Sequence, residues 1–62
     1  MNTAFLDRMT TQLKLNKSAA CRRSIQRTLA VIKKKAEDGR YKNDVEAESD
    51  FRQRVEREEA CK

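Results

Sequence analysis

The 62-residue chain carries 15 lysines and arginines against 10 aspartates and glutamates, has no histidine, and has a formal net charge of +5. That length allows one small domain, residues 1–62, and no apolar run reaches the roughly 20 residues that span a bilayer. The N-terminus lacks the basic start and apolar stretch of a secretory signal. We therefore expect a cytoplasmic protein that makes no membrane contact.

The first predicted element is a helix over about residues 3–14. Apolar side chains recur there every four residues, which places them on one helical face; they are Phe5, Met9 and Leu13. Asn2 or Thr3 is suited to cap the first turn. Residues 16–18 (Asn, Lys, Ser) form the expected break after it. Because that break contains neither glycine nor proline, one bent helix over residues 3–38 stays open as an alternative.

The second predicted helix covers about residues 18–38. Its apolar seam falls within about 100° of arc at 100° per residue and consists of Cys21, Ile25, Thr28, Leu29, Ile32 and Ala36. Gly39, the only glycine, follows directly, and glycine adopts the positive φ of a helix C-terminus without steric cost. The chain is therefore expected to reverse direction at this point.

The third predicted helix covers about residues 43–60. Asn43 or Asp44 is expected to cap its first turn, where acidic side chains also suit the positive end of the helix dipole. Its apolar seam is thin and consists of Ala47, Phe51 and Val55. A seam this small leaves self-association as a homodimer open, because a short chain buries too little apolar surface to be very stable alone.

Residue numbering supports a hairpin of the second and third helices. In an antiparallel pair the numbers of facing residues have a constant sum, and Leu29 with Phe51 and Ile25 with Val55 share the same sum. The predicted fold class is therefore all-α: an antiparallel helical hairpin of residues 18–38 and 43–60 with an additional N-terminal helix. That helix either lies across the groove between the two arms or meets its counterpart in a second copy.

Cys21 and Cys61 fall at the same level of this hairpin. If the third helix runs to residue 60, however, Cys61 points about 80° away from the apolar seam. Intracellular thiols also stay reduced as a rule. The expectation is a buried Cys21 and an exposed Cys61, with a disulfide between the two as the alternative that fraying of the last turn would permit.

The residue types present do not support catalysis or metal binding. Without histidine the usual general base near neutral pH is missing, and Ser18, Ser24 and Ser49 have no defined base beside them. Two cysteines without a C-x-x-C spacing do not supply a tetrahedral zinc site within one chain. We expect a protein that is not an enzyme and that uses no metal or cofactor.

Charge is divided between the two arms of the hairpin. Residues 14–42 contain ten basic and two acidic residues, whereas residues 43–62 contain seven acidic and four basic ones. On the second helix, Arg23, Arg27 and Lys34 lie together on the side away from the apolar seam. This stripe is an ordinary solvated face, a contact surface for an acidic protein partner, or a surface for nucleic acid. The sequence favours a protein over a nucleic acid, because it has few aromatic residues for base stacking.

The overall character of the chain resembles a family of short helical phage proteins. The features that carry the resemblance are a helical hairpin of about sixty residues and the stretch from Cys21 to Ile32, which is followed by three lysines. In these features the chain is similar to the products of small early reading frames of lambdoid temperate phages. Those reading frames lie between the recombination exonuclease and the excisionase. The resemblance implies a non-catalytic accessory protein of the host cytoplasm. Such a protein would adjust host replication or cell-cycle control through protein–protein contacts.

Overall fold

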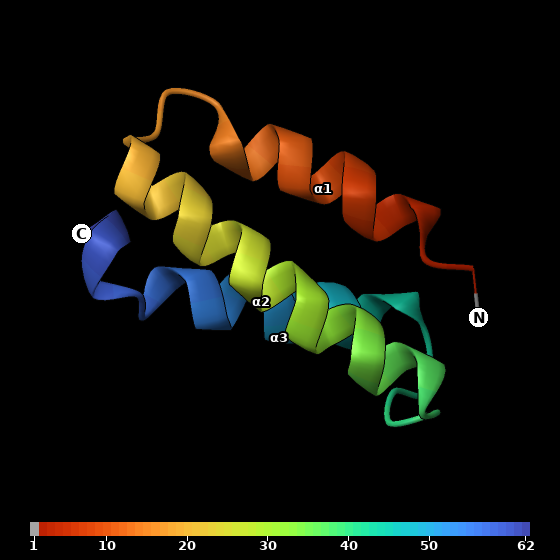
Figure 1. Ribbon diagram of the computed structural model, residues 1–62. Helices are drawn as coiled ribbons and strands as arrows, with labels where there is room; N and C mark the ends of the chain where they lie inside the picture. The colour runs from red at the N-terminus through yellow and green to blue at the C-terminus, as the bar shows by residue number, and fades with distance from the viewer. Residues whose placement is uncertain (1) are drawn as a thin grey trace.

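A computed structural model describes residues 2–62 of the chain, and all of its regular elements are helical. The elements are α1 (Ala4–Lys14), α2 (Ala19–Glu37), α3 (Asp44–Glu56) and a short 3₁₀ helix, η1 (Glu59–Cys61). As Figure 1 shows, α2 runs antiparallel to both α1 and α3, so that α1 and α3 run in the same direction. The predicted all-α hairpin with an additional N-terminal helix is confirmed.

The junction between α1 and α2 is a true break. Asn16 adopts a φ of 62°, in the left-handed region that asparagine tolerates better than most residues. Ser18 then caps α2, because its side-chain oxygen accepts a hydrogen bond of 3.2 Å from the backbone N–H of Cys21. The alternative of one bent helix over residues 3–38 is therefore wrong. Positive φ at Asn16 and the Ser18 cap end one helix and begin another without glycine or proline.

Gly39 ends α2 as predicted, in the left-handed conformation with a φ of 72°. The backbone N–H of Gly39 donates to the carbonyl of Ala36 at 3.1 Å, and that of Arg40 donates to Lys35 at 3.0 Å. This pair of bonds is the Schellman motif, which satisfies carbonyls that the last helical turn leaves free. After the turn, Asn43 caps α3 by accepting a hydrogen bond from Glu46 N–H.

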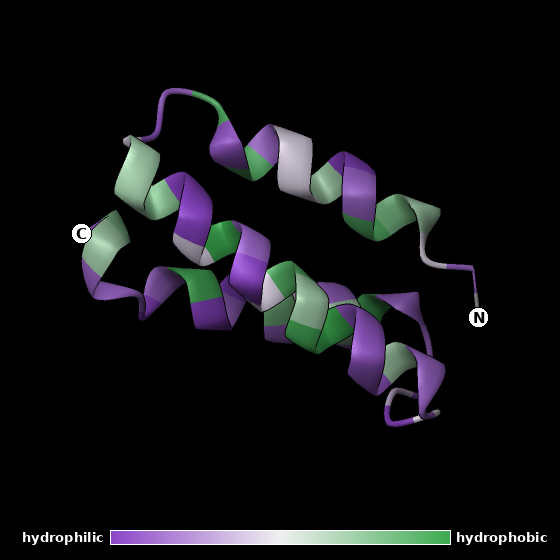
Figure 2. Cartoon of the chain, in the orientation of Figure 1, coloured by the Kyte–Doolittle hydropathy of each residue, from purple (hydrophilic) through white to green (hydrophobic). Residues whose placement is uncertain are grey.

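The core lies where all three helices meet. Leu6 of α1, Ile25 and Ile32 of α2, and Ala47 and Phe51 of α3 are completely buried. They form one cluster with other largely buried residues, namely Met9, Cys21, Leu29 and Val55. Figure 2 shows hydrophobic and hydrophilic residues alternating along every helix, as expected for amphipathic helices packed on a shared core.

The first helix packs on the hairpin of its own chain. Lys33 of α2 forms an ion pair of 2.8 Å with Asp7 of α1, and Lys14 of α1 donates a hydrogen bond to Gln26 of α2. Of the predicted α1 stripe, Met9 is buried and Phe5 and Leu13 are half-buried against the core. The stripe is therefore mainly core, although two of its three side chains keep an exposed edge.

The end of the third helix differs from the sequence expectation. Helix α3 ends at Glu56 and not at residue 60, because Glu58 adopts an extended conformation with a ψ of 126° and η1 turns the chain back. This turn brings Cys61 to Cys21, and the two form a disulfide with a Cα–Cα distance of 4.8 Å. The preference for free thiols, with Cys61 exposed, is thus wrong. The 80° misalignment assumed four further residues of helix that the chain does not form.

Candidate functional site

The most distinctive chemical surface is the outward face of α2. Arg23, Arg27 and Lys34 are all exposed there, and within residues 2–62 none of the three forms an ion pair or a side-chain hydrogen bond. At 100° per residue the three side chains lie within about 40° of arc, so they line one ridge about 16 Å long. We call Arg23, Arg27 and Lys34 the basic face.

The run of three lysines is divided among three directions by the helical turn. Lys33 points to α1 and pairs with Asp7 at 2.8 Å, whereas Lys35 points to α3 and pairs with Asp50 at 3.2 Å. Lys34, between them, points outward. Two of the three lysines thus have a structural partner, and only Lys34 remains available on the basic face.

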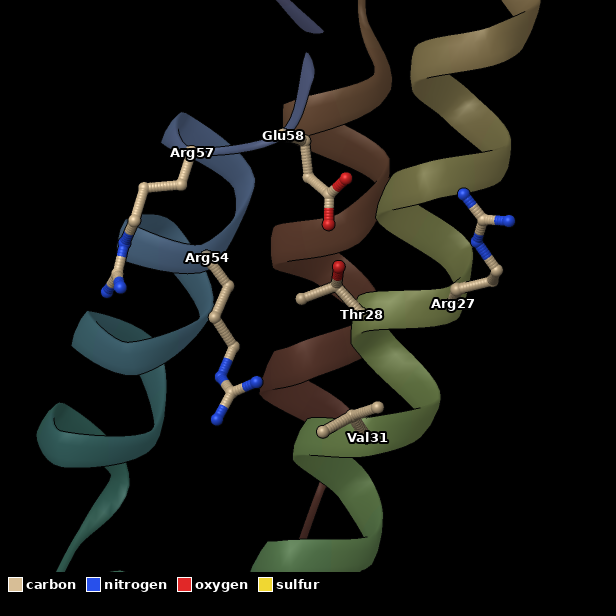
Figure 3. A pocket seen from close by; sticks show the side chains of 6 residues that line it. All are labelled: Arg27, Thr28, Val31, Arg54, Arg57 and Glu58. Carbon is tan, nitrogen blue, oxygen red and sulfur yellow. The ribbon is translucent and has the colours of Figure 1, made fainter. Parts of the chain in front are cut away.

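A groove between α2 and α3 borders the basic face. It has a volume of about 260 Å³ and is lined by Arg27, Thr28, Val31, Arg54, Arg57 and Glu58. In Figure 3 the guanidinium of Arg54 reaches from α3 toward α2, and the carboxylate of Glu58 lies above Thr28. Arg27 and Arg57 extend outward on opposite sides of this groove. The structure therefore places Arg54 of α3, and Arg57 directly after that helix, in one groove with Arg27 of α2.

Sequence reasoning missed the contribution of α3, because it treated residues 43–62 as an acidic arm. Four of the five acids of α3 lie within its first seven residues, whereas Arg54 lies in its last turn and Arg57 directly follows its end. Their three-residue spacing around the core residue Val55 is the signal that both flank the same edge of the helix. Charge counted over a whole segment hides such an arrangement, because a helix distributes its residues over all faces.

Arg54 is held in place by a polar network at the closed end of the hairpin. Its Nε donates to Asp50 Oδ1 at 3.0 Å, while Tyr41 OH and Lys35 Nζ donate to Asp50 Oδ2 at 2.6 Å and 3.2 Å. The Lys35 ammonium also lies 5.3 Å from the centre of the Tyr41 ring. Within residues 2–62 Arg54 bonds through its Nε alone, so its two terminal nitrogens are left to face the groove.

The titration of this network follows from its contacts. Desolvation alone would raise the pKa of Asp50, but hydrogen bonds from Tyr41, Arg54 and Lys35 outweigh it, so the pKa of this carboxyl is lowered. Desolvation and the hydrogen bond to Asp50 raise the pKa of the Tyr41 hydroxyl. Asp50 therefore stays ionised and Tyr41 stays protonated across the neutral range, and the anchor of Arg54 persists there.

One apolar side chain interrupts the charged surface. Val31 is 45% exposed and lies in the groove beside Arg27 and Arg54. The aromatic residues contribute nothing to this surface: Phe51 is buried in the core, and Phe5 and Tyr41 are half-buried elsewhere. The surface thus combines cations with an aliphatic contact and offers no ring for base stacking.

Neither a metal centre nor a membrane span is found in residues 2–62. No group of three or more cysteine, aspartate or glutamate side chains in this range is arranged to hold a metal ion. No helix in the same range is long and apolar enough to cross a membrane.

Comparison of the chain with protein-family models, with curated proteins and with solved structures found no match. The candidate site therefore rests on geometry and charge alone.

Proposed function

We propose that the chain is a small, non-enzymatic binding module that recognises an acidic surface on another protein. The observation that carries this proposal is the basic face itself, in which Arg23, Arg27 and Lys34 are aligned and exposed and form no ion pair or side-chain hydrogen bond within residues 2–62. The charge of a cationic side chain that pairs internally, such as Lys33 with Asp7, is partly compensated by the neighbouring carboxylate, whereas no ion pair within residues 2–62 compensates these three. An acidic segment laid along α2 would meet all three within about three helical turns.

The surroundings of the basic face favour a protein over a nucleic acid. Val31 provides an exposed aliphatic contact in the adjoining groove, which suits an apolar side chain next to the carboxylates of a protein partner. Glu58 lies in the same groove and would repel a continuous polyanion. The absence of an aromatic side chain from this face, among residues 2–62, removes the usual platform for bases.

The biological setting of this proposal comes from the phage resemblance. If the chain is an early accessory protein of a temperate phage, its partner is a protein of the host cytoplasm that takes part in replication or cell-cycle control. Binding alone would suffice for such a role, because occupying an acidic contact surface blocks or redirects the partner's own associations.

The proposal is tested by capture experiments with matched variants. The tagged chain and its Arg23→Gln/Arg27→Gln/Lys34→Gln variant are incubated with nuclease-treated bacterial lysate, and captured proteins are quantified by mass spectrometry. The control variant, Arg40→Gln/Lys42→Gln/Lys62→Gln, removes the same charge from exposed positions elsewhere. The proposal expects discrete acidic partners that the first variant loses and the control retains. Equal capture by both variants would contradict it.

Binding to nucleic acid is the second candidate, favoured by the alignment of three cations along about 16 Å of helix. It predicts a mobility shift of duplex DNA or single-stranded RNA that weakens steeply as salt rises, because bound cations release counterions from the phosphates. Val31→Ser separates the two candidates. This change lowers affinity for a protein that contacts the groove and leaves a phosphate contact unchanged.

A further inference from the structure

A second groove lies between α1 and α3, and no residue of α2 lines it. Two hollows of about 280 and 300 Å³ follow one another along this seam and share Arg52. The first is lined by Phe5, Arg8, Met9, Gln12, Glu48 and Arg52. The second is lined by Leu13, Lys17, Arg52, Val55, Glu56 and Cys61. We call the two hollows together the α1–α3 groove.

The apolar part of this groove is incompletely covered. Phe5 and Leu13 are half-buried, and each keeps an exposed edge in its hollow. Leu15, just after α1, is 58% exposed. A chain of this size has little apolar surface to spare, so covering these side chains would add to a thin core.

In each hollow a cation of the α1 side lies across from a carboxylate of the α3 side, to which Arg52 also belongs. Arg8 on the α1 side shares the first hollow with Glu48 on the α3 side, and Lys17 shares the second with Glu56. Within residues 2–62 no ion pair crosses the groove: Glu48 pairs with Arg52 of its own helix at 3.2 Å, while Arg8, Lys17 and Glu56 form no ion pair. Each hollow is therefore bordered by charges that are too far apart to pair within the chain.

A two-fold axis along the groove brings these charges together between two copies. Because α1 and α3 run in the same direction (Figure 1), rotation about such an axis places α1 of one copy opposite α3 of the other at the same level. Arg8 then faces Glu48 of the second copy, and Lys17 faces Glu56 of the second copy. Two-fold symmetry repeats each contact, which makes four complementary pairs around a shared apolar strip.

We propose that the α1–α3 groove is the self-association surface of this chain and that its occupant is the same groove of a second copy. A standard interface buries about 800 Å² per partner, less than a fifth of the 4368 Å² accessible surface of the chain. This dimer leaves the basic face of α2 free, so it displays two basic faces. The inference does not depend on the proposed function, because no residue of the basic face takes part.

The test is a charge-exchange experiment on the full chain. Lys17→Glu and Glu56→Lys each alter an exposed side chain that forms no ion pair within residues 2–62, so folding is expected to persist and is checked by circular dichroism. Each variant alone places like charges opposite one another twice in its homodimer. We expect the dimer dissociation constant to rise about tenfold in each case, as for several surface ion pairs reversed together.

Mixing the Lys17→Glu and Glu56→Lys variants tests whether the groove is occupied by the same groove of a second copy. In a heterodimer of Lys17→Glu with Glu56→Lys, every altered position faces an opposite charge, so equimolar mixing should restore the native dissociation constant in sedimentation equilibrium. Lys42→Glu and Glu37→Lys make the same charge changes at exposed positions outside the groove and should leave dimerisation unchanged. A native chain that stays monomeric up to millimolar concentration overturns the proposal. So does a mixture that associates no better than its components.

Discussion

The two ends of the α2–α3 hairpin are closed by different means. At one end the chain itself turns through Gly39, and the Tyr41–Asp50 contact fastens the turn to α3 at 2.6 Å. At the other end no backbone connects the two helices, and the disulfide of Cys21 with Cys61 joins them across a sequence separation of 40. The first closure uses local backbone geometry and hydrogen bonds, whereas the second constrains a long loop. We therefore expect the two ends to contribute differently to stability.

The largest difference should follow from opening the disulfide end. In the chain-entropy description, a loop of this length restricts the unfolded ensemble enough to contribute about 4 kcal/mol. Cys21→Ala/Cys61→Ala should lower the free energy of unfolding by about that amount in urea titrations. Reducing the native chain with a thiol reagent is the matched control, since it keeps both side chains, and it should give a similar loss. A loss below about 1 kcal/mol in both cases would contradict the larger contribution expected from the disulfide end.

A smaller effect is expected from the polar network at the closed end. Asp50→Asn weakens three hydrogen bonds at once, from Tyr41, Lys35 and Arg54, and should lower the free energy of unfolding by about 2 kcal/mol. Glu48→Gln on the same helix is the control. At protein concentrations at which the chain is monomeric, it removes only an exposed pair with Arg52 and should cost about 0.5 kcal/mol or less. Equal costs would mean that the network contributes nothing beyond surface charge.

The turn itself should contribute less again. Gly39→Ala forces a residue with a Cβ to adopt a φ of 72°, which costs about 1 kcal/mol. The added methyl group would meet no atom within 4 Å, so backbone strain is the whole effect. Gly39→Asn should cost less, because asparagine tolerates this conformation. Differential scanning calorimetry of the native chain and the two variants measures their order of thermal stability. An alanine variant as stable as the native chain would contradict the expected order.

Acid should weaken the end of the hairpin that contains Asp50. Because its pKa is lowered in the folded chain, the contribution of its charged form is complete above the unfolded pKa of about 4 and is lost as pH falls below it. The Asp50→Asn variant should therefore lose less stability than the native chain between neutral pH and about pH 2. Comparing their urea midpoints over this range checks the sign. The stability that the native chain loses through protonation of Asp50 should be smaller than the stability lost through the Asp50→Asn substitution, because a protonated carboxyl still accepts hydrogen bonds.

The helix boundaries near Ser18, Gly39 and Asn43 were predictable because their signals are local. A capping oxygen satisfies N–H groups two or three residues away, and glycine relieves strain at its own position. Each of these residues acts in the structure as expected. The break at Asn16 was predicted in place but not with certainty, because a positive φ at asparagine is tolerated and not required.

The groove arginines and the dimer surface could be identified only from the tertiary structure. Arg54 faces α2 only because Asp50, Tyr41 and Lys35 fix its orientation across two helices. Likewise, Arg8 and Lys17 lie far from Glu48 and Glu56 in sequence, and only the packing of both α1 and α3 on α2 brings them to facing sides of one groove. Charge sums over whole segments carry no information on these directions.

What the sequence determined alone is the set of three amphipathic helices, their caps and the basic face of α2, since these depend on spacing within a few residues. What only the tertiary structure decided is the last turn of the chain. Residues 57–61 contain no glycine or proline, so nothing local ends α3 at Glu56. The chain leaves the helix there, and the contact so formed joins Cys61 to Cys21 across the molecule. A long-range bond of that kind outweighs one turn of helix, because the helix contributes little per residue and the bond constrains the whole hairpin.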